Sequence, residues 1–191
     1  MGQRHTLGRD NLMSIRLWLK AGLLGVVVVL YNPIVTRTQE QVESGRRAEA
    51  FVLPTWDGKV LKSSSLKGQV IMLEFFQTWC PDCQKAAPEI EQIYKRYKEK
   101  GFTVVGISHD KEGAKVVEPY VKKYSLTYPV VIGDLSIAVS YTGLTPAKPG
   151  FRIPFIVLID RNGLIAGQYE EGKNDEATDP KLLEALIKKL L

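Results

Sequence analysis

The sequence predicts an α/β protein with one mixed central sheet flanked by helices, preceded by one N-terminal transmembrane helix. Residues 48–191 alternate between apolar runs of strand length and stretches with helical periodicity, which is the pattern of a sheet covered by helices. Residues 15–35 form a separate apolar segment that is long enough to cross a bilayer. A chain of 191 residues accommodates one such domain and an appendage.

The formal net charge of +5 lies almost entirely in the N-terminal part of the chain. Residues 1–47 carry seven Lys/Arg and three Asp/Glu, whereas residues 48–191 carry nineteen and eighteen. A nucleic-acid-binding domain requires a basic face with interleaved aromatic residues or a known motif. The main domain has neither, so we expect no nucleic-acid partner.

The apolar segment predicts an uncleaved signal anchor. As a helix, residues 15–35 rise about 30 Å, the thickness of a bilayer core. Trp18 and Tyr31 lie near its two ends, where interfacial aromatic residues are expected. Residues 1–20 contain four basic residues and one acidic residue. After Val35, three basic residues are balanced by three acidic ones up to Glu49. This asymmetry predicts a cytoplasmic N-terminus and an extracytoplasmic domain on the periplasmic or cell-surface side.

Other interpretations of this segment remain open but are less favoured. A cleaved signal peptide needs a small-x-small site soon after the apolar core, and the first such pattern, residues 48–50, lies far downstream. A lipoprotein would need a cysteine after this segment, but both cysteines lie in the domain. A buried core helix is disfavoured because Pro33 and the polar linker separate the segment from the rest of the chain. The predicted organisation is a cytoplasmic stub (1–14), an anchor (15–35), a linker (36–47) and the domain (48–191).

The elements of the domain follow from local patterns. Residues 50–68 predict two short strands joined by an Asp57-Gly58 turn, and the apolar run 69–77 predicts a central strand covered on both faces. A helix from Cys80 to Lys100 has one apolar stripe and ends at Gly101. Residues 102–108 then predict another buried strand.

The second half of the domain continues this alternation. Spaced apolar residues from Val117 to Tyr124 predict a helix, with Pro119 at its start or kinking it. Residues 127–133 and 155–160 predict strands, and Asn162-Gly163 predicts a hairpin turn into residues 164–169. Asp179-Pro180 caps a last helix, and five of its residues are predicted to face inward: Leu182, Leu183, Leu186, Ile187 and Leu190.

The two cysteines, Cys80 and Cys83, lie in the segment WCPDC between the central strand and the following helix. Cys80 near the N-cap and Cys83 one turn inside lie on one face and can form a disulfide. The helix N-terminus favours a thiolate at Cys80, and Asp82 opposes it. We expect Cys80 to be exposed and to attack, and Cys83 to resolve the mixed disulfide.

Two other interpretations of the cysteine pair are weaker. An inert disulfide across so short a loop stabilises little. A zinc site needs two further ligands, and the histidines are His5, before the apolar segment, and His109. No metal or other cofactor is expected. His109 itself could act as a base or ligand, although a loop-end histidine without an identified partner usually does neither.

The segment FQTWCPDC, with Pro88 five residues after Cys83, resembles the active-site segment of thioredoxins. The anchored N-terminus and the downstream pattern are similar to the TlpA/ResA branch, whose members act outside the cytoplasm. The resemblance covers residues 48–191 and implies a thioredoxin fold and dithiol exchange. It departs at Ala86, where many members have an acid, and at residues 142–151, an added Pro/Gly-rich loop for recognition or simple padding.

The resemblance also implies further site residues. The segment IPFIVLID matches the family's cis-proline loop, which implies a cis peptide bond before Pro154 and a backbone contact from Ile153 to an extended substrate. Trp79 completes the implied substrate-binding set. Glu74 lies six positions before Cys80, where thioredoxins carry a buried acid. A buried carboxyl has a raised pKa and could accept the proton of Cys83, whereas a strand-edge position would leave it solvated.

The function expected is disulfide exchange with protein thiols and disulfides. The resemblance allows a role as a reductant in cytochrome c maturation, re-reduced by a membrane electron donor. Two alternatives are kept. A thiol peroxidase on this fold needs a Thr three residues before its reactive cysteine, where this chain has Gln77, and a nearby Arg. A copper metallochaperone would bind the ion through the two thiols, and copper titration of the reduced protein distinguishes it.

Overall fold

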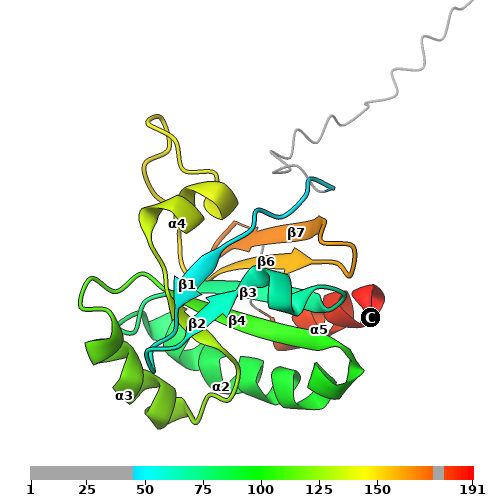
Figure 1. Ribbon diagram of the computed structural model, residues 1–191, viewed down its shortest axis with the longest axis horizontal. Coiled ribbons are helices and arrows are strands. Elements are labelled where there is room, and N and C mark those ends of the chain that lie inside the picture. The colour runs from blue at the N-terminus through cyan, green and yellow to red at the C-terminus, as the bar shows by residue number, and fades with distance from the viewer. Residues whose placement is uncertain (1–44, 174–178) are drawn as a thin grey trace, which may run out of the picture. The chain divides into compact units, whose positions relative to one another are not determined.

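The computed structural model describes residues 45–173 and 179–191, which form a mixed sheet with helices on both faces (Figure 1). The predicted α/β class is confirmed. The elements are β1 (Val52–Pro54), β2 (Val60–Lys62), the 3-10 turn η2 (Ser63–Leu66), β3 (Val70–Phe76), α2 (Pro81–Tyr97), η3 (Lys98–Lys100), β4 (Phe102–Ser108), α3 (Ala114–Tyr124), β5 (Val130–Ile132), α4 (Leu135–Thr142), β6 (Phe155–Ile159), β7 (Ile165–Glu170) and α5 (Pro180–Leu190).

The main sheet has the strand order β5-β4-β3-β6-β7, with β3 at its centre. Strands β3, β4 and β5 are parallel, whereas β6 and β7 run antiparallel to their neighbours. The carboxyl ends of β3, β4 and β5 therefore meet at one edge, where β6 begins. The loops that follow these three strands, and the loop that precedes β6, converge at that edge.

The two faces of the sheet pack against different elements. Along β3, Val70, Met72 and Phe76 contribute to the core formed with α2, α3 and α5, whereas Leu73 and Phe75 contribute to the core formed with α4, β1 and η2. Because side chains alternate along a strand, Glu74 lies on the same face as Phe76, beneath α2. Figure 1 shows the three long helices gathered on one side of the sheet and α4 on the other.

The predicted anchor, residues 15–35, lies outside the described residues. Within residues 45–173 and 179–191, no helix has the length and apolar character that crossing a bilayer requires. The residues at the predicted boundary between linker and domain hydrogen-bond to β7 and to the turn before it. Gly45 N–H donates to the Ile165 carbonyl at 2.8 Å, and Ala48 N–H donates to the Gly163 carbonyl at 2.9 Å.

The helix boundaries have local causes. Cys80 is the N-cap of α2 and Pro81 its first residue, while Gly101 ends the following 3-10 turn with a left-handed φ of 84°. Helix α3 begins at Ala114, so Pro119 lies inside it and not at its start. Helix α4 was not predicted. Its N-cap, Asp134, accepts a hydrogen bond from Ile137 N–H at 3.0 Å.

Helix α5 begins after its predicted cap, Asp179, whose carboxylate accepts from the N–H groups of Lys181 and Leu182. Leu183 and Ile187 are buried, and Leu186 and Leu190 pack partly against the same core. The prediction that Leu182 faces inward is wrong, because its side chain is 49% exposed.

This difference gives a matched pair of substitutions. Ile187 is 0% exposed, so Ile187→Ala should leave a cavity and lower the free energy of unfolding by about 2–5 kcal/mol. Leu182→Ala should change it by less than about 0.5 kcal/mol. Urea denaturation of both variants measures the two values, and comparable losses would show that α5 packs through a different face.

Candidate functional site

The two cysteines lie at the sheet edge where the parallel strands end. Cys80 caps α2, and its Sγ accepts a hydrogen bond from Cys83 N–H at 3.3 Å. The Cys80 thiol also lies 3.8 Å from the Ile153 carbonyl oxygen, to which it donates. Both cysteines are free thiols. The spacing therefore places the two sulfurs at adjacent positions on the first turn of the helix, as predicted.

The expectation that Cys80 is exposed is wrong. Cys80 is 4% exposed and Cys83 0%, so both are buried in the dithiol form. The cause is the segment before β6, which brings the Ile153 carbonyl against the Cys80 sulfur. The neighbouring Trp79 is 66% exposed and presents a large aromatic surface beside the motif.

The Ile153–Pro154 peptide bond is cis, which confirms the implied cis proline. Two hydrogen bonds from the end of β7 hold this segment. Arg152 N–H donates to Glu170 Oε1 at 2.9 Å, and Glu171 N–H donates to the Pro154 carbonyl at 3.3 Å. The loop that faces Cys80 is therefore fixed by strand β7.

Asp110, a site residue that was not predicted from the sequence, holds the loop before Cys80. This buried carboxylate, just after β4, accepts from Thr78 N–H at 2.9 Å, from the Thr78 hydroxyl at 3.0 Å and from the Ser108 hydroxyl at 2.9 Å. Gln84 Nε2 donates to the Thr78 carbonyl at 2.8 Å. An Asp directly after a buried strand, at the edge where the strands end, was the available signal.

Glu74 is buried in the middle of β3, which excludes the solvated strand-edge alternative. The Tyr128 hydroxyl donates to its Oε2 at 3.3 Å, while among the described residues its buried Oε1 has no hydrogen-bond partner. Burial raises the pKa of Glu74 to about 7, and the hydrogen bond from Tyr128 partly opposes that shift. The carboxyl can therefore gain and lose a proton near neutral pH.

Cys83 lies in the first turn of α2, where the charge of Glu74 acts on its thiol. Burial, the hydrogen bond with Cys80 and the charge of Glu74 together raise the pKa of Cys83 far above its usual range. The Tyr120 hydroxyl donates to the Cys83 carbonyl at 3.0 Å and fixes the backbone of this turn. Because the buried Cys83 thiol does not ionise by itself near neutral pH, it needs a base beside it to become a nucleophile.

Other residues considered from the sequence have packing roles here. The His109 ring stacks on Phe75 with centroids 5.6 Å apart, and burial lowers its pKa. Gln77 donates to the His109 carbonyl at 3.0 Å, and Ala86 packs against the helical core. Within the described ranges, no group of three or more His, Cys, Asp or Glu side chains is placed to hold a metal ion.

The added loop, residues 142–151, joins α4 to the cis-proline segment. Thr145 and Lys148 exchange backbone hydrogen bonds of 3.0 Å around a tight turn. At the end of the loop, the Phe151 ring packs edge-on against Phe75 and Phe155, with centroids 6.0 and 5.7 Å apart. The loop is thus attached to the core directly before Ile153.

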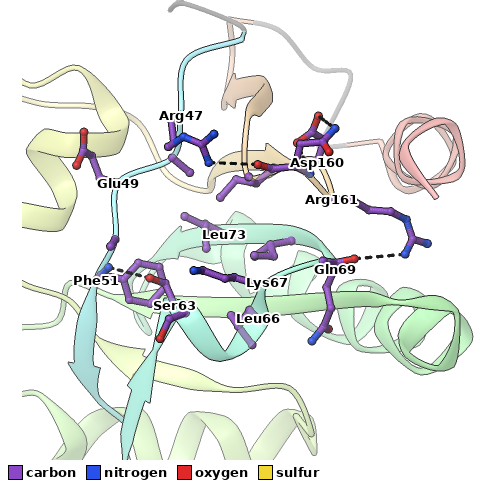
Figure 2. A pocket seen from close by; sticks show the side chains of 18 of the residues that line it. Arg47, Glu49, Phe51, Ser63, Leu66, Lys67, Gln69, Leu73, Asp160 and Arg161 are labelled. Carbon is purple, nitrogen blue, oxygen red and sulfur yellow. Dashed lines mark hydrogen bonds between the residues drawn. The ribbon is translucent and has the colours of Figure 1, made fainter.

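A cavity of about 510 Å³ lies away from this site. Its lining includes Gly68 and Gln69, which precede β3, and Asp160 and Arg161, which follow β6. These positions lie at the sheet edge opposite the cysteines, because β6 runs antiparallel to β3. Figure 2 shows its apolar floor around Leu73, and none of the site residues lines it.

The geometry assembles the parts of a dithiol–disulfide reaction: a helix-capping thiol, a second thiol one turn inside the helix, and a buried carboxyl of raised pKa. The residues involved come from β3, from α2, which follows it directly, and from the loop before β6, which lies more than seventy residues later in the sequence. Protein thiols and disulfides are the substrates that suit a sulfur flanked by an exposed tryptophan and a backbone segment.

Comparison with known proteins agrees with this chemistry. Residues 44–169 match the AhpC/TSA family. The chain is 30% identical over 183 residues to the thiol-disulfide oxidoreductase ResA of Bacillus thuringiensis subsp. konkukian, covering 95% of this chain and 98% of that one. It is 25% identical over 169 residues to ResA of Halalkalibacterium halodurans, covering 86% and 92%.

A solved structure gives the same fold. The thiol:disulfide interchange protein of the thioredoxin family from Chlorobium tepidum superposes with a TM-score of 0.66 at 28% identity, covering 78% of this chain and 97% of that one. The chain belongs to the AhpC/TSA family and is a thioredoxin-like thiol–disulfide oxidoreductase related to ResA.

Proposed function

We propose that Cys80 attacks a disulfide of a partner protein and that Cys83 resolves the resulting mixed disulfide. The observation that carries this proposal is the position of Cys80 Sγ, at the N-cap of α2 and against the Ile153 carbonyl. A substrate chain beside Ile153 and Trp79 would bring its own sulfur to that point. Cys83, fully buried one turn inside, reaches Cys80 but no external disulfide.

The reaction transfers two electrons from the enzyme to the partner. The Cys80 thiolate attacks one sulfur of the partner's disulfide, which forms a Cys80–partner bond and releases the other sulfur as a thiolate. Cys83 then attacks Cys80 Sγ, the Cys80–partner bond breaks, and the second partner thiolate leaves and is protonated. The products are a reduced partner and a Cys80–Cys83 disulfide, which an external dithiol must reduce again.

Glu74 acts in the second step. The Cys83 thiol must lose its proton as it attacks, and its raised pKa prevents prior ionisation. Glu74, with a pKa of about 7, is a buried base on the face of the sheet that α2, the helix of Cys83, covers. The proton passes from Cys83 to the Glu74 carboxylate.

The proposed setting is the outer side of a membrane. Residues 15–35 would anchor the chain with its N-terminus in the cytoplasm, as the basic flank before them supports. The domain would act there as a reductant, with a membrane electron donor restoring the dithiol. Cytochrome c maturation is one role that the resemblance to the TlpA/ResA branch allows.

Trapping experiments test the roles of the two cysteines. Cys83→Ser should accumulate stable mixed disulfides through Cys80, because the resolving thiol is absent. Cys80→Ser, the matched control, should accumulate none, because Cys83 is 0% exposed and lies inside the first turn of α2, whereas Cys80 lies at the N-cap. Non-reducing electrophoresis of the full-length variants after exposure to a disulfide-containing protein measures both, and equal trapping would refute the assignment.

Glu74→Gln should make the oxidised protein less sensitive to pH. The folded-state pKa of about 7 exceeds the unfolded value of ~4.3, so the folded protein holds a proton that the unfolded chain has lost. As pH rises from the unfolded pKa to the folded pKa, wild type should therefore lose roughly 4 kcal/mol of unfolding free energy relative to the variant. Denaturant midpoints at several pH values measure the loss.

The same variant should resolve mixed disulfides more slowly, by roughly 100-fold, the usual size of a general-base contribution. Reduced full-length protein treated with dithionitrobenzoate releases two chromophoric thiolates in sequence, and the second reports the attack by Cys83. A variant that matches wild type in both stability and this rate would remove Glu74 from the mechanism.

The anchor proposal predicts that the mature protein retains residues 1–35. Mass spectrometry of the membrane-extracted protein should give the full mass of the chain. A reporter that is active outside the cytoplasm should work when fused after Leu191. A soluble product that begins beyond residue 30 would show cleavage instead.

A further inference from the structure

Two tyrosine hydroxyls reach the buried Cys83–Glu74 pair. Tyr120, on α3, donates to the Cys83 carbonyl at 3.0 Å, and Tyr128 donates to Glu74 Oε2 at 3.3 Å. Both tyrosines belong to the segment between β4 and β5. Tyr120 touches only the backbone of Cys83 in this interaction, whereas Tyr128 touches the titrating carboxyl itself.

The sheet is built so that Tyr128 can reach Glu74. On β4, Gly106 is the register partner of Glu74. A Cβ at Gly106 would lie 3.3 Å from Tyr128 Cε2 and 3.3 Å from Phe76 Cε1, closer than side chains normally pack. The absent side chain leaves space for the Tyr128 ring. On the other side, the Tyr94 ring packs edge-on against Tyr128, with centroids 5.9 Å apart.

The surroundings leave few other groups to control the charge of Glu74. Among the described residues, the titratable side chains whose pKa the charge of Glu74 affects are Cys83 from α2, Tyr120 from α3 and Tyr128 from the segment before β5. The charge of the buried Glu91, on α2, acts on Tyr128. Its neighbours on the sheet, Gly106 and Ile156, do not titrate. Burial raises the pKa of Tyr128 well above its usual range, so this hydroxyl keeps its proton and remains a donor.

We propose that Tyr128 is a positioning residue for the exchange reaction, holding Glu74 by Oε2 in the ionised form and leaving Oε1 to take the proton of Cys83. The proposal rests on the acceptor role of Glu74 given above. A hydrogen bond to a carboxylate favours the charged form over the neutral acid. Tyr128 therefore sets the pH at which Glu74 becomes a base, without exchanging a proton itself.

The test is the pH dependence of the second thiolate release in the dithionitrobenzoate reaction of the full-length protein. In wild type the rate should rise with a midpoint near 7, as Glu74 ionises. Tyr128→Phe keeps the ring and removes the hydroxyl, so its midpoint should rise by about one pH unit. At pH 7 the rate should fall about fivefold, while the plateau at high pH matches wild type.

A matched control and a reference variant separate the outcomes. Tyr94→Phe loses a hydroxyl beside the same ring and should keep the wild-type midpoint. Glu74→Gln should give a flat, slow profile. If Glu74→Gln retains the wild-type profile, the acceptor role itself fails. If Glu74→Gln is flat but Tyr128→Phe keeps the wild-type midpoint, or loses rate equally at every pH, only the role of Tyr128 is overturned.

If Tyr128→Phe is too unstable for kinetics, a substitution at Gly106, which packs against the Tyr128 ring, gives a second measurement. Gly106→Ala places a Cβ 3.3 Å from the rings of both Tyr128 and Phe76, so we expect the packing of the Tyr128 ring to change while every titrating group is kept. A displaced midpoint with an unchanged plateau supports the proposal. A wild-type midpoint in this variant, together with an intact fold, contradicts it.

Discussion

The burial of one carboxyl under the active-site helix is the constraint on which the rest of this structure depends. Glu74 occupies the middle of the central strand, on the face that α2 covers, and among the described residues its carboxyl accepts a hydrogen bond from one hydroxyl. Burying a group that can be charged opposes folding unless the charge is neutralised or paired. Here burial raises the pKa of Glu74 to about 7, so the carboxyl can be neutral when buried and can still exchange a proton near neutral pH.

The reacting sulfurs are arranged around this carboxyl by topology. Parallel strands β3 and β4 end at one sheet edge, so the loop before Cys80 and Asp110 meet there. The antiparallel strand β6 begins at that edge and delivers Ile153 to the Cys80 thiol. Fixing the loop from both sides keeps the N-cap sulfur in place. The dithiol chemistry of the family thus follows from where three strands end or begin.

Much of this arrangement could be predicted from the sequence, because its signals are local. Strand alternation places Glu74 on the side of Phe76, and the position of Pro81 fixes the start of α2 with Cys80 as its cap. The features that were missed depend on tertiary contacts. Cys80 is buried by a segment more than seventy residues later, Leu182 is exposed in the first turn of α5, and α4 is short and carries little amphipathic periodicity. Tyr128 has no local signal, since its role exists only where Gly106 leaves space.

The account is tested most directly by the titration of the Glu74 carboxyl itself. Carbon-13 NMR of full-length oxidised protein with labelled glutamate, assigned by the signal absent from Glu74→Gln, would follow this one group. A midpoint near 7 is the predicted result. A midpoint near 4.3, the value of a solvated glutamate, would show that the carboxyl is already charged at every working pH, and would contradict its burial and its part in the exchange reaction.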